Sequence, residues 1–166
     1  VIWAASMVAC GDADGAVTGN TRRFGSSLEK IKQVVDVRDG EIMFGLNMVV
    51  HKGRTIFVGD TSVHEYPTSE QMAEIAISAA RVVKLFGFDP KVAFVSHSTF
   101  GQPITSRTKH IRKAFEILKE KKVNFEFDGD MQPDVALNKE YQDLYPFSKI
   151  VGNANILIMP GQHSAA

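Results

Sequence analysis

Hydroxyl-bearing side chains follow the short apolar run 92–95, in a position where they could bind an anion. Ser96, Ser98 and Thr99 come directly after this run, and Gly101 closes the segment. Hydroxyl groups and free backbone N–H groups beyond the end of a strand form phosphate-binding sites. The segment therefore has the composition of an anion site, although a hydroxyl-rich turn without a ligand accounts for the same residues equally well.

His97 lies between two of these serines, which raises the question of a serine nucleophile with a histidine base. Neighbouring side chains of an extended strand point to opposite faces, so His97 should point away from Ser96 and Ser98. The segment also lacks the G-x-S-x-G turn that presents a nucleophilic serine. We therefore expect no serine nucleophile here.

Three aspartates lie where apolar runs end. Asp60 follows the run 55–58, and Asp128 and Asp130 follow the run 125–127. Converging carboxylates bind Mg²⁺ or perform acid–base chemistry, whereas single aspartates at such positions commonly cap the next element. Because no recognised metal-ligand spacing accompanies them, we favour a structural or substrate-orienting role. The five histidines also lack the spacing of a zinc site, so no metal is expected.

Four basic residues crowd the start of a helix predicted over 106–121. They are Arg107, Lys109, Arg112 and Lys113. They could contact the phosphates of a nucleotide-bearing ligand, or they could form a solvated helix face. The sequence leaves both possibilities open.

The apolar runs that precede these polar clusters define the expected sheet. We predict strands over 92–95, 125–127 and 156–159, with helices over 69–86 and 106–121 between elements. Repeated strand-then-helix order is typical of a parallel sheet with helices on its faces. Such open sheets bind ligands beyond the carboxyl ends of their strands, where the polar clusters lie.

Other elements complete the expected α/β fold. The runs 42–50 and 55–58 flank a turn at 51–54 and predict a β-hairpin. Thr68 and Gln71 form the capping box of the helix over 69–86. The remaining predicted elements are helices over 3–10, from 20 or 21 to 35, and over 133–144, and a brief strand over 16–18.

Composition narrows the class of protein. The 166 residues contain 19 Lys plus Arg and 19 Asp plus Glu, so the formal charge is zero. This balance favours neither nucleic acid nor an anionic membrane as a partner. The single cysteine, Cys10, excludes an internal disulfide and fits a reducing cytoplasm, and no apolar run is long enough to span a membrane.

Several motifs occur here in the order seen in phosphate acetyl/butyryltransferases, which the chain resembles over nearly its whole length. They are Gly11-Asp-Ala-Asp-Gly15, Asp60-Thr61, Pro67-Thr-Ser-Glu-Gln-Met-Ala-Glu-Ile-Ala76, Val95-Ser-His-Ser-Thr-Phe-Gly101, Asp128-Gly-Asp-Met-Gln132 and Ala154-Asn-Ile-Leu-Ile-Met-Pro160. Other segments are similar to the C-terminal phosphate-acetyltransferase-like domain of large NADP-dependent malic enzymes. These are Val63-His-Glu, Asp134-Val-Ala-Leu-Asn138, Tyr145-Pro-Phe-Ser148 and Met159-Pro-Gly-Gln-His-Ser164.

The resemblance implies a fold and a cleft. The fold is a three-layer, isocitrate/isopropylmalate-dehydrogenase-like α/β fold with a mostly parallel sheet and a β-hairpin insertion. Residues 1–166 are expected to be a partial domain that lacks both ends of the full one. The implied ligand is an acyl-CoA or another phosphate-bearing molecule. The expected cleft residues are Asp60, Thr61, Ser96, Ser98, Thr99, Gly101, Asp128, Asp130 and Gln132.

Two departures from the family pattern bear on activity. The transacetylases carry an Arg-Pro pair whose arginine is expected to bind phosphate, and the corresponding residues here are Glu29 and Lys30. A carboxylate at this position would repel phosphate. The family's Asn-Asp-Leu-Ser-Arg-Gly segment, thought to supply catalytic groups, is expected to lie beyond residue 166.

The resemblance therefore predicts a regulatory and oligomerising domain without transacetylase activity and without catalytic residues of its own. Acetyl-CoA is the implied effector, and a cytoplasmic homodimer or higher homo-oligomer is the implied assembly. Malate oxidation and decarboxylation to pyruvate, with NADP and a divalent metal, would belong to a part of the parent enzyme outside this chain. The alternatives are an active phosphate acetyltransferase and a purely structural assembly module.

Overall fold

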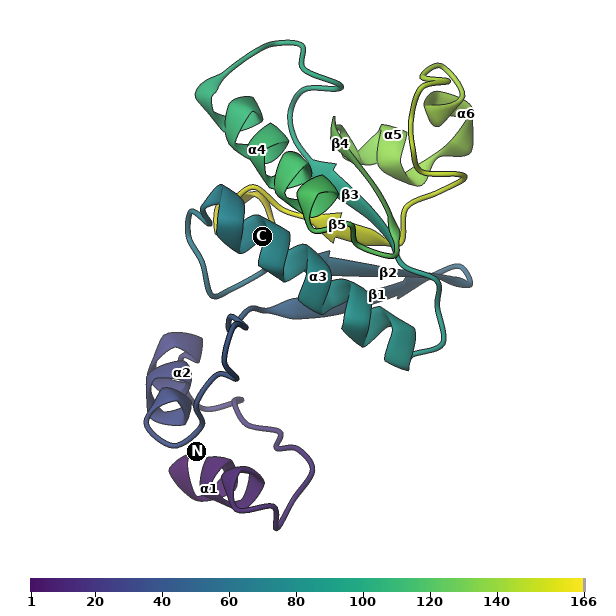
Figure 1. Ribbon diagram of the computed structural model, residues 1–166. Helices are drawn as coiled ribbons and strands as arrows, with labels where there is room; N and C mark the ends of the chain where they lie inside the picture. Colours follow the sequence, from purple (N-terminus) through teal and green to yellow (C-terminus); the bar gives the residue numbers. More distant parts are fainter. Residues whose placement is uncertain (166) are drawn as a thin grey trace. The chain divides into compact units, whose positions relative to one another are not determined.

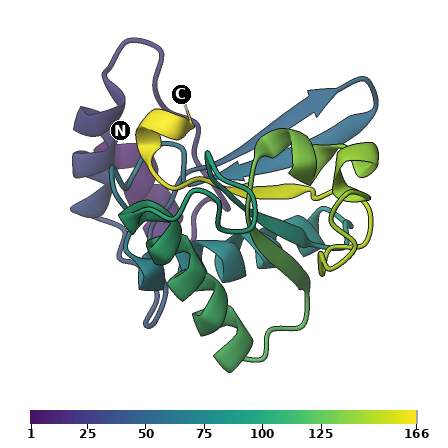
Figure 2. The ribbon, with the colours of Figure 1, turned by 90° about the horizontal axis from the view of Figure 1, so that it is seen from above.

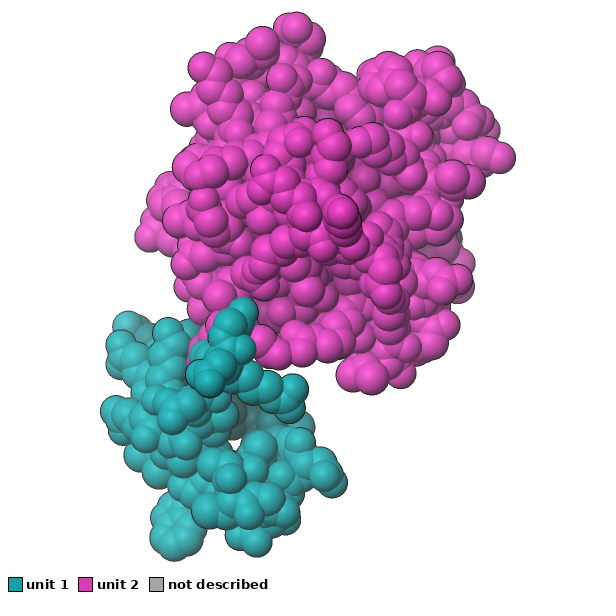
Figure 3. Space-filling model, viewed as in Figure 1, with its two compact units in different colours: residues 1–40 teal, residues 41–166 magenta. Residues whose placement is uncertain are grey.

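The computed structural model describes residues 1–165. The chain forms two compact units, Val1–Gly40 and Glu41–Ala166 (Figure 3). Each unit packs within itself. Among the described residues, no helix is both long and apolar enough to cross a membrane.

The first unit contains two helices, α1 (Ile2–Ala9) and α2 (Phe24–Lys32). The predicted strand over 16–18 was wrong, because these residues are exposed and have no paired strand within residues 1–40. Helix α2 is also shorter than predicted at both ends. It begins after Arg23, which has an extended backbone, and Val34 and Val35 form a turn on the Ile31 carbonyl rather than continuing the helix.

The second unit is built on a five-stranded sheet with the order β1-β2-β5-β3-β4 (Figure 1). Strands β1 (Leu46–His51) and β2 (Arg54–Gly59) form the predicted antiparallel hairpin. The other strands, β5 (Ile156–Ile158), β3 (Lys91–Val95) and β4 (Glu126–Met131), run parallel to β2 and to each other. The mostly parallel sheet with a hairpin is confirmed.

Helices cover both faces of this sheet (Figure 2). Helices α3 (Ser69–Leu85) and α4 (Ser106–Glu120) pack on one face, and the short helix α5 (Pro133–Leu137) packs on the other. Strand β3 is apolar on both sides, so Val92 and Phe94 join the core under α3 and α4, and Ala93 and Val95 join the core beside α5. This two-sided burial explains its continuous apolar run and gives the predicted three-layer arrangement.

Side-chain caps fix where the two long helices start. The predicted capping box of α3 is present, with Thr68 accepting from the Gln71 N–H and Gln71 accepting from the Thr68 N–H. Helix α4 begins with a second box that pairs Thr105 with Thr108. Such boxes satisfy N–H groups that the first helical turn leaves free. These capping boxes therefore fix the residues at which α3 and α4 begin.

Strand β4 is longer than predicted. It continues through Met131, so Asp128 and Asp130 lie inside the strand and not in a turn after it. Gly129 between them has a φ of +138°, and a Cβ there would lie 2.7 Å from the Phe94 carbonyl oxygen. A glycine is therefore required where β4 passes Phe94 of β3.

Two other boundaries differ from prediction. The helix expected over 133–144 is divided into α5 and α6 (Lys139–Gln142), because Asn138 takes an extended backbone and caps α6 with its side chain. Strand β1 begins at Leu46 and not at Ile42, and Ile42 packs against the core from a loop. A single 3₁₀ turn, η1 (Gln162–Ser164), follows β5.

Candidate functional site

A cleft of about 460 Å³ lies beyond the carboxyl ends of β3 and β5. Its lining includes Ser96 and His97 after β3, Arg107 on α4, and His163 after β5. A smaller cavity of about 130 Å³ is lined partly by the same residues, Arg107 among them. The main cleft therefore occupies the place where open α/β sheets bind ligands.

Arg107 is held in the wall of the cleft by two aromatic side chains. Its Nη1 atom lies 2.9 Å from Nε2 of His163, and its guanidinium carbon lies 5.3 Å from the centre of the Tyr66 ring. The Tyr66 and His163 rings are themselves 5.6 Å apart. Because a guanidinium can only donate hydrogen bonds, Nε2 of His163 is the acceptor and this ring is neutral in the contact.

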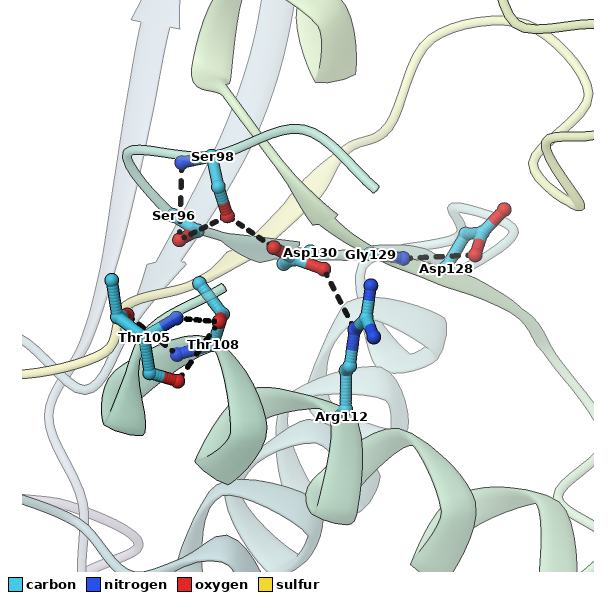
Figure 4. Close-up of polar contacts among 8 residues, drawn as sticks. All are labelled: Ser96, Ser98, Thr105, Thr108, Arg112, Asp128, Gly129 and Asp130. Carbon is cyan, nitrogen blue, oxygen red and sulfur yellow. Dashed lines mark hydrogen bonds and ion pairs between the residues drawn. The ribbon is translucent and has the colours of Figure 1, made fainter. Parts of the chain in front are cut away.

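A buried chain of hydrogen bonds runs from Ser96, which lines the cleft, through Ser98 to Asp130 (Figure 4). The Ser98 N–H donates to Ser96 Oγ over 3.3 Å, and the two hydroxyl oxygens are 3.1 Å apart. The Ser98 hydroxyl donates to the Asp130 carboxylate. The proton of the Ser98 hydroxyl is therefore directed at Asp130.

Asp130 also forms an ion pair with Arg112 on α4, the only basic side chain that pairs with it among the described residues. Its Oδ1 atom lies 3.6 Å from Nε of Arg112 on α4, and this oxygen has no hydrogen-bond partner in the described part of the chain. Asp130 is 1% exposed. A buried carboxylate needs such donors and cations, so Asp130 connects β4, the loop after β3 and helix α4.

Further contacts attach the loop after β3 to the end of β4. The Gln132 N–H donates to Thr99 Oγ1 over 3.3 Å, and the Gln132 side chain donates to the His97 carbonyl over 2.9 Å. Gly101 lies against Arg112, whose guanidinium occupies the space that a Cβ would need. These contacts position the loop, and Thr99 and Gln132 also line a separate cavity of about 410 Å³ beside α5 and α6.

Asp128 points away from Asp130 (Figure 4). Its carboxylate accepts from the Gly129 N–H over 2.9 Å and from the Lys149 N–H over 2.6 Å. It thus fixes the segment that leads into β5.

Asp60 holds the loop after β2. It accepts hydrogen bonds from the backbone N–H groups of Gly45, Ser62, Val63 and His64, and it lies 2.7 Å from the His64 ring. Burial would raise the pKa of this carboxyl, but the hydrogen bonds from the N–H groups and the His64 ring outweigh it and leave the pKa below its ordinary value. Thr61 joins the same loop through an N–H bond of 3.2 Å to the Gly45 carbonyl.

The structure separates the residues that the sequence grouped. Among the nine expected ligand residues, Ser96 lines the main cleft, whereas Ser98 and Asp130 are buried and are not part of its lining. The three aspartates hold three different segments, and no group of three metal-binding side chains occurs among the described residues. His97 is exposed whereas Ser96 and Ser98 are buried, but these residues follow β3 in a bend and not in an extended strand, and Ser96 and His97 both line the main cleft.

The basic residues of α4 have different surroundings. Arg112 faces Asp130, Lys113 pairs with Glu70 over 2.6 Å, and Arg107 lines the cleft. The sequence left open whether Arg107 contacts a ligand or lies on a solvated face, and it gave no signal that His163 or Tyr66 would contact Arg107. Glu29, the departure from the family pattern, is exposed on α2 within the first unit.

Sequence comparison identifies relatives across the full chain. The phosphate acetyl/butaryl transferase family profile matches residues 1–166. The NADP-dependent malic enzyme of Rhizobium meliloti is 46% identical over 164 residues, which are 99% of this chain and 22% of that protein. The phosphate acetyltransferase of Buchnera aphidicola is 31% identical over 166 residues, 99% of this chain and 23% of that enzyme. The chain thus spans less than a quarter of these curated relatives.

Solved structures that are similar to this chain are also phosphotransacetylases. A phosphotransacetylase from Streptococcus pyogenes superposes with a TM-score of 0.87 at 27% identity, covering 99% of this chain and 51% of that one. The EutD phosphotransacetylase from Staphylococcus aureus superposes with a TM-score of 0.84 at 26% identity, covering 99% and 52%.

Replacing Ser98 with alanine should destabilise the protein, because the buried Asp130 carboxylate loses its hydroxyl donor. We expect a loss of about 2–3 kcal/mol in the free energy of unfolding, measured by urea denaturation. Ser69→Ala is the matched control, since Ser69 is equally buried but donates to the neutral His110 carbonyl and should cost about 1 kcal/mol. Equal losses in the two variants would contradict the importance of the Asp130 charge.

Proposed function

We propose, because this chain belongs to the phosphate acetyl/butaryl transferase family, that it is the regulatory and oligomerising phosphate-acetyltransferase-like domain of an NADP-dependent malic enzyme. The 46% identity to the Rhizobium meliloti malic enzyme supports this parent over a free-standing transferase, for which the phosphate acetyltransferase relative is 31% identical. The parent reaction would be the oxidative decarboxylation of malate to pyruvate. NADP and a divalent metal would bind in a part of the parent protein outside this chain.

The cleft beyond β3 and β5 is the observation that carries the proposal. It is about 460 Å³ in volume and lies where this class of sheet binds ligands. Its lining combines apolar side chains with Arg107, a combination that suits a ligand with both an acyl chain and a phosphate. We assign acetyl-CoA as the effector of this cleft.

Two features favour binding without transfer. The Ser98 hydroxyl, one of the expected ligand contacts, donates to Asp130 and so is not directed at a bound molecule. Glu29 replaces the arginine that the family resemblance places against phosphate, and a carboxylate there opposes phosphate binding. The cleft would then sense acetyl-CoA, and the chemistry would take place elsewhere in the parent enzyme.

An active phosphate acetyltransferase is the second candidate, favoured by the Buchnera relative and by both phosphotransacetylase structures. In that reaction the CoA thiolate attacks the carbonyl carbon of acetyl phosphate. The thioester bond forms, the carbon–oxygen bond to phosphate breaks, and inorganic phosphate leaves. The transferase would need a cation other than residue 29 to hold the departing phosphate.

The proposed assembly role rests on the exposed edge of the β1–β2 hairpin. Strand β1 lies at the edge of the sheet and pairs only with β2 among the described strands. Met48, Val49 and Val50 on this strand are 50%, 48% and 65% exposed. Unpaired apolar edges pair readily with another strand, so a second copy of this chain would cover them. We assign a cytoplasmic homo-oligomer, and neither nucleic acid nor membrane as a partner, in keeping with the zero formal charge and the single cysteine.

Replacing Val49 with lysine should convert the oligomer to a monomer, because a charge at an edge strand prevents pairing between copies. Light scattering coupled to size-exclusion chromatography measures the mass. Val151→Lys is the control, since Val151 is also exposed, at 73%, but lies outside β1 and should leave the mass unchanged. A monomeric unsubstituted protein would contradict the assembly role.

The protein should bind acetyl-CoA without making it. Calorimetric titration with acetyl-CoA should give saturable heat, whereas acetyl phosphate and CoA mixed with the protein should form acetyl-CoA no faster than in buffer. A known phosphate acetyltransferase, assayed in parallel, shows that the assay detects transfer. Acetyl-CoA formation above the buffer rate would establish the second candidate, and the absence of heat would contradict the effector.

A further inference from the structure

We propose that Arg107, held in place by His163 and Tyr66, is the residue that binds the phosphate of the ligand in the main cleft. The inference rests on the proposed function, because it names the group that recognises the effector. Arg107 belongs to none of the motifs that carry the family resemblance.

The charge of the cleft supports an anionic ligand. Among the described residues that line the main cleft and the smaller cavity, Arg107 is the one side chain with a permanent charge, and no Asp or Glu is present. The chain as a whole is neutral. The cleft is therefore locally positive in a protein that is not, which favours binding of anions there.

Arg107 differs from Arg112 and Lys113 on the same helix because no carboxylate among the described residues forms an ion pair with it. Arg112 is paired with Asp130 and Lys113 with Glu70. The partners of Arg107 in the described structure are a neutral imidazole and a phenol ring. These contacts fix the position of the guanidinium and leave its charge available to a ligand.

The contacts of Arg107 also leave hydrogen-bond donors free. A guanidinium has five N–H donors in one plane, and the contact with His163 uses one of them. The Tyr66 ring packs against the guanidinium, which reduces the entropy lost when a ligand binds. The remaining donors match the paired oxygens of a phosphate.

The ligand chemistry is that of a phosphate group. Two sources share this chemistry, a free phosphate or acyl phosphate and the phosphates of an acyl-CoA. Arg107 lines both the main cleft and the smaller cavity, so a phosphate bound to it would have the larger space beside it for the rest of the ligand. Titration with each source separates the two.

Arg107→Gln tests the anchor in calorimetric titrations of the chain with inorganic phosphate and with acetyl-CoA, both at low ionic strength. Glutamine retains polarity but removes the charge, so the probe that uses this site should bind roughly 10- to 100-fold more weakly. Lys109→Gln is the matched control, because Lys109 is exposed on the same helix and lines neither cavity. The loss of affinity in this control should be much smaller than in Arg107→Gln, because Lys109 lines neither cavity and contributes only a longer-range charge to binding.

The outcomes distinguish this inference from the proposed function. If acetyl-CoA binds both the unsubstituted protein and Arg107→Gln equally, the anchor is overturned while the effector stands. If phosphate alone binds, and only with Arg107 present, the anchor stands while acetyl-CoA is rejected as the effector. If neither probe binds the unsubstituted protein, both are overturned.

His163 acts as a positioning residue for Arg107, and a rescue experiment tests this role. His163→Ala removes the acceptor and should weaken binding of the same probe several-fold. His163→Gln supplies an amide oxygen that can accept from Arg107 and should restore most of the affinity. Equal affinities in the two variants would show that His163 does not hold Arg107 for the ligand.

Discussion

The buried hydrogen bond from Ser98 to the Asp130 carboxylate is the constraint on which the candidate site depends. It joins the loop after β3 to the middle of β4, and Arg112 of α4 lies against the other carboxylate oxygen. A buried charge without such partners would be costly, so the three elements are held together at this point. The same loop carries Ser96 and His97 into the wall of the cleft. The shape of the cleft is therefore fixed from behind, by residues that do not face the ligand.

Local sequence signals were sufficient for most of the fold. The continuous apolar run 92–95 predicts a strand of the parallel sheet, and Thr68 with Gln71 predicts the start of α3. The extent of β4 was not predictable in this way. Its two aspartates resemble turn residues locally, but their partners, Lys149 and Ser98, are 21 and 32 residues away. Contacts at that separation are set by the topology of the sheet.

The position of the site was predictable, but its composition was only partly so. Strand ends and polar clusters indicated the crevice, and Ser96 does line it. The direction of the Ser98 hydroxyl could not be inferred, because it depends on where β4 places Asp130. The Arg107 contact with His163 spans 56 residues and joins two segments with no shared motif. Among the described residues that line the cleft, the permanently charged side chain is therefore Arg107 of α4, which we propose as the anchor of a phosphate-bearing ligand.

A crystal structure of the protein soaked with acetyl-CoA would test the central claim most directly. The account predicts electron density for the ligand in the cleft beyond β3 and β5, with a phosphate within hydrogen-bond distance of the Arg107 guanidinium. The Ser98 to Asp130 hydrogen bond should be unchanged. Ligand density confined to the cavity lined by Thr99 and Gln132, with none in the main cleft, would contradict the account.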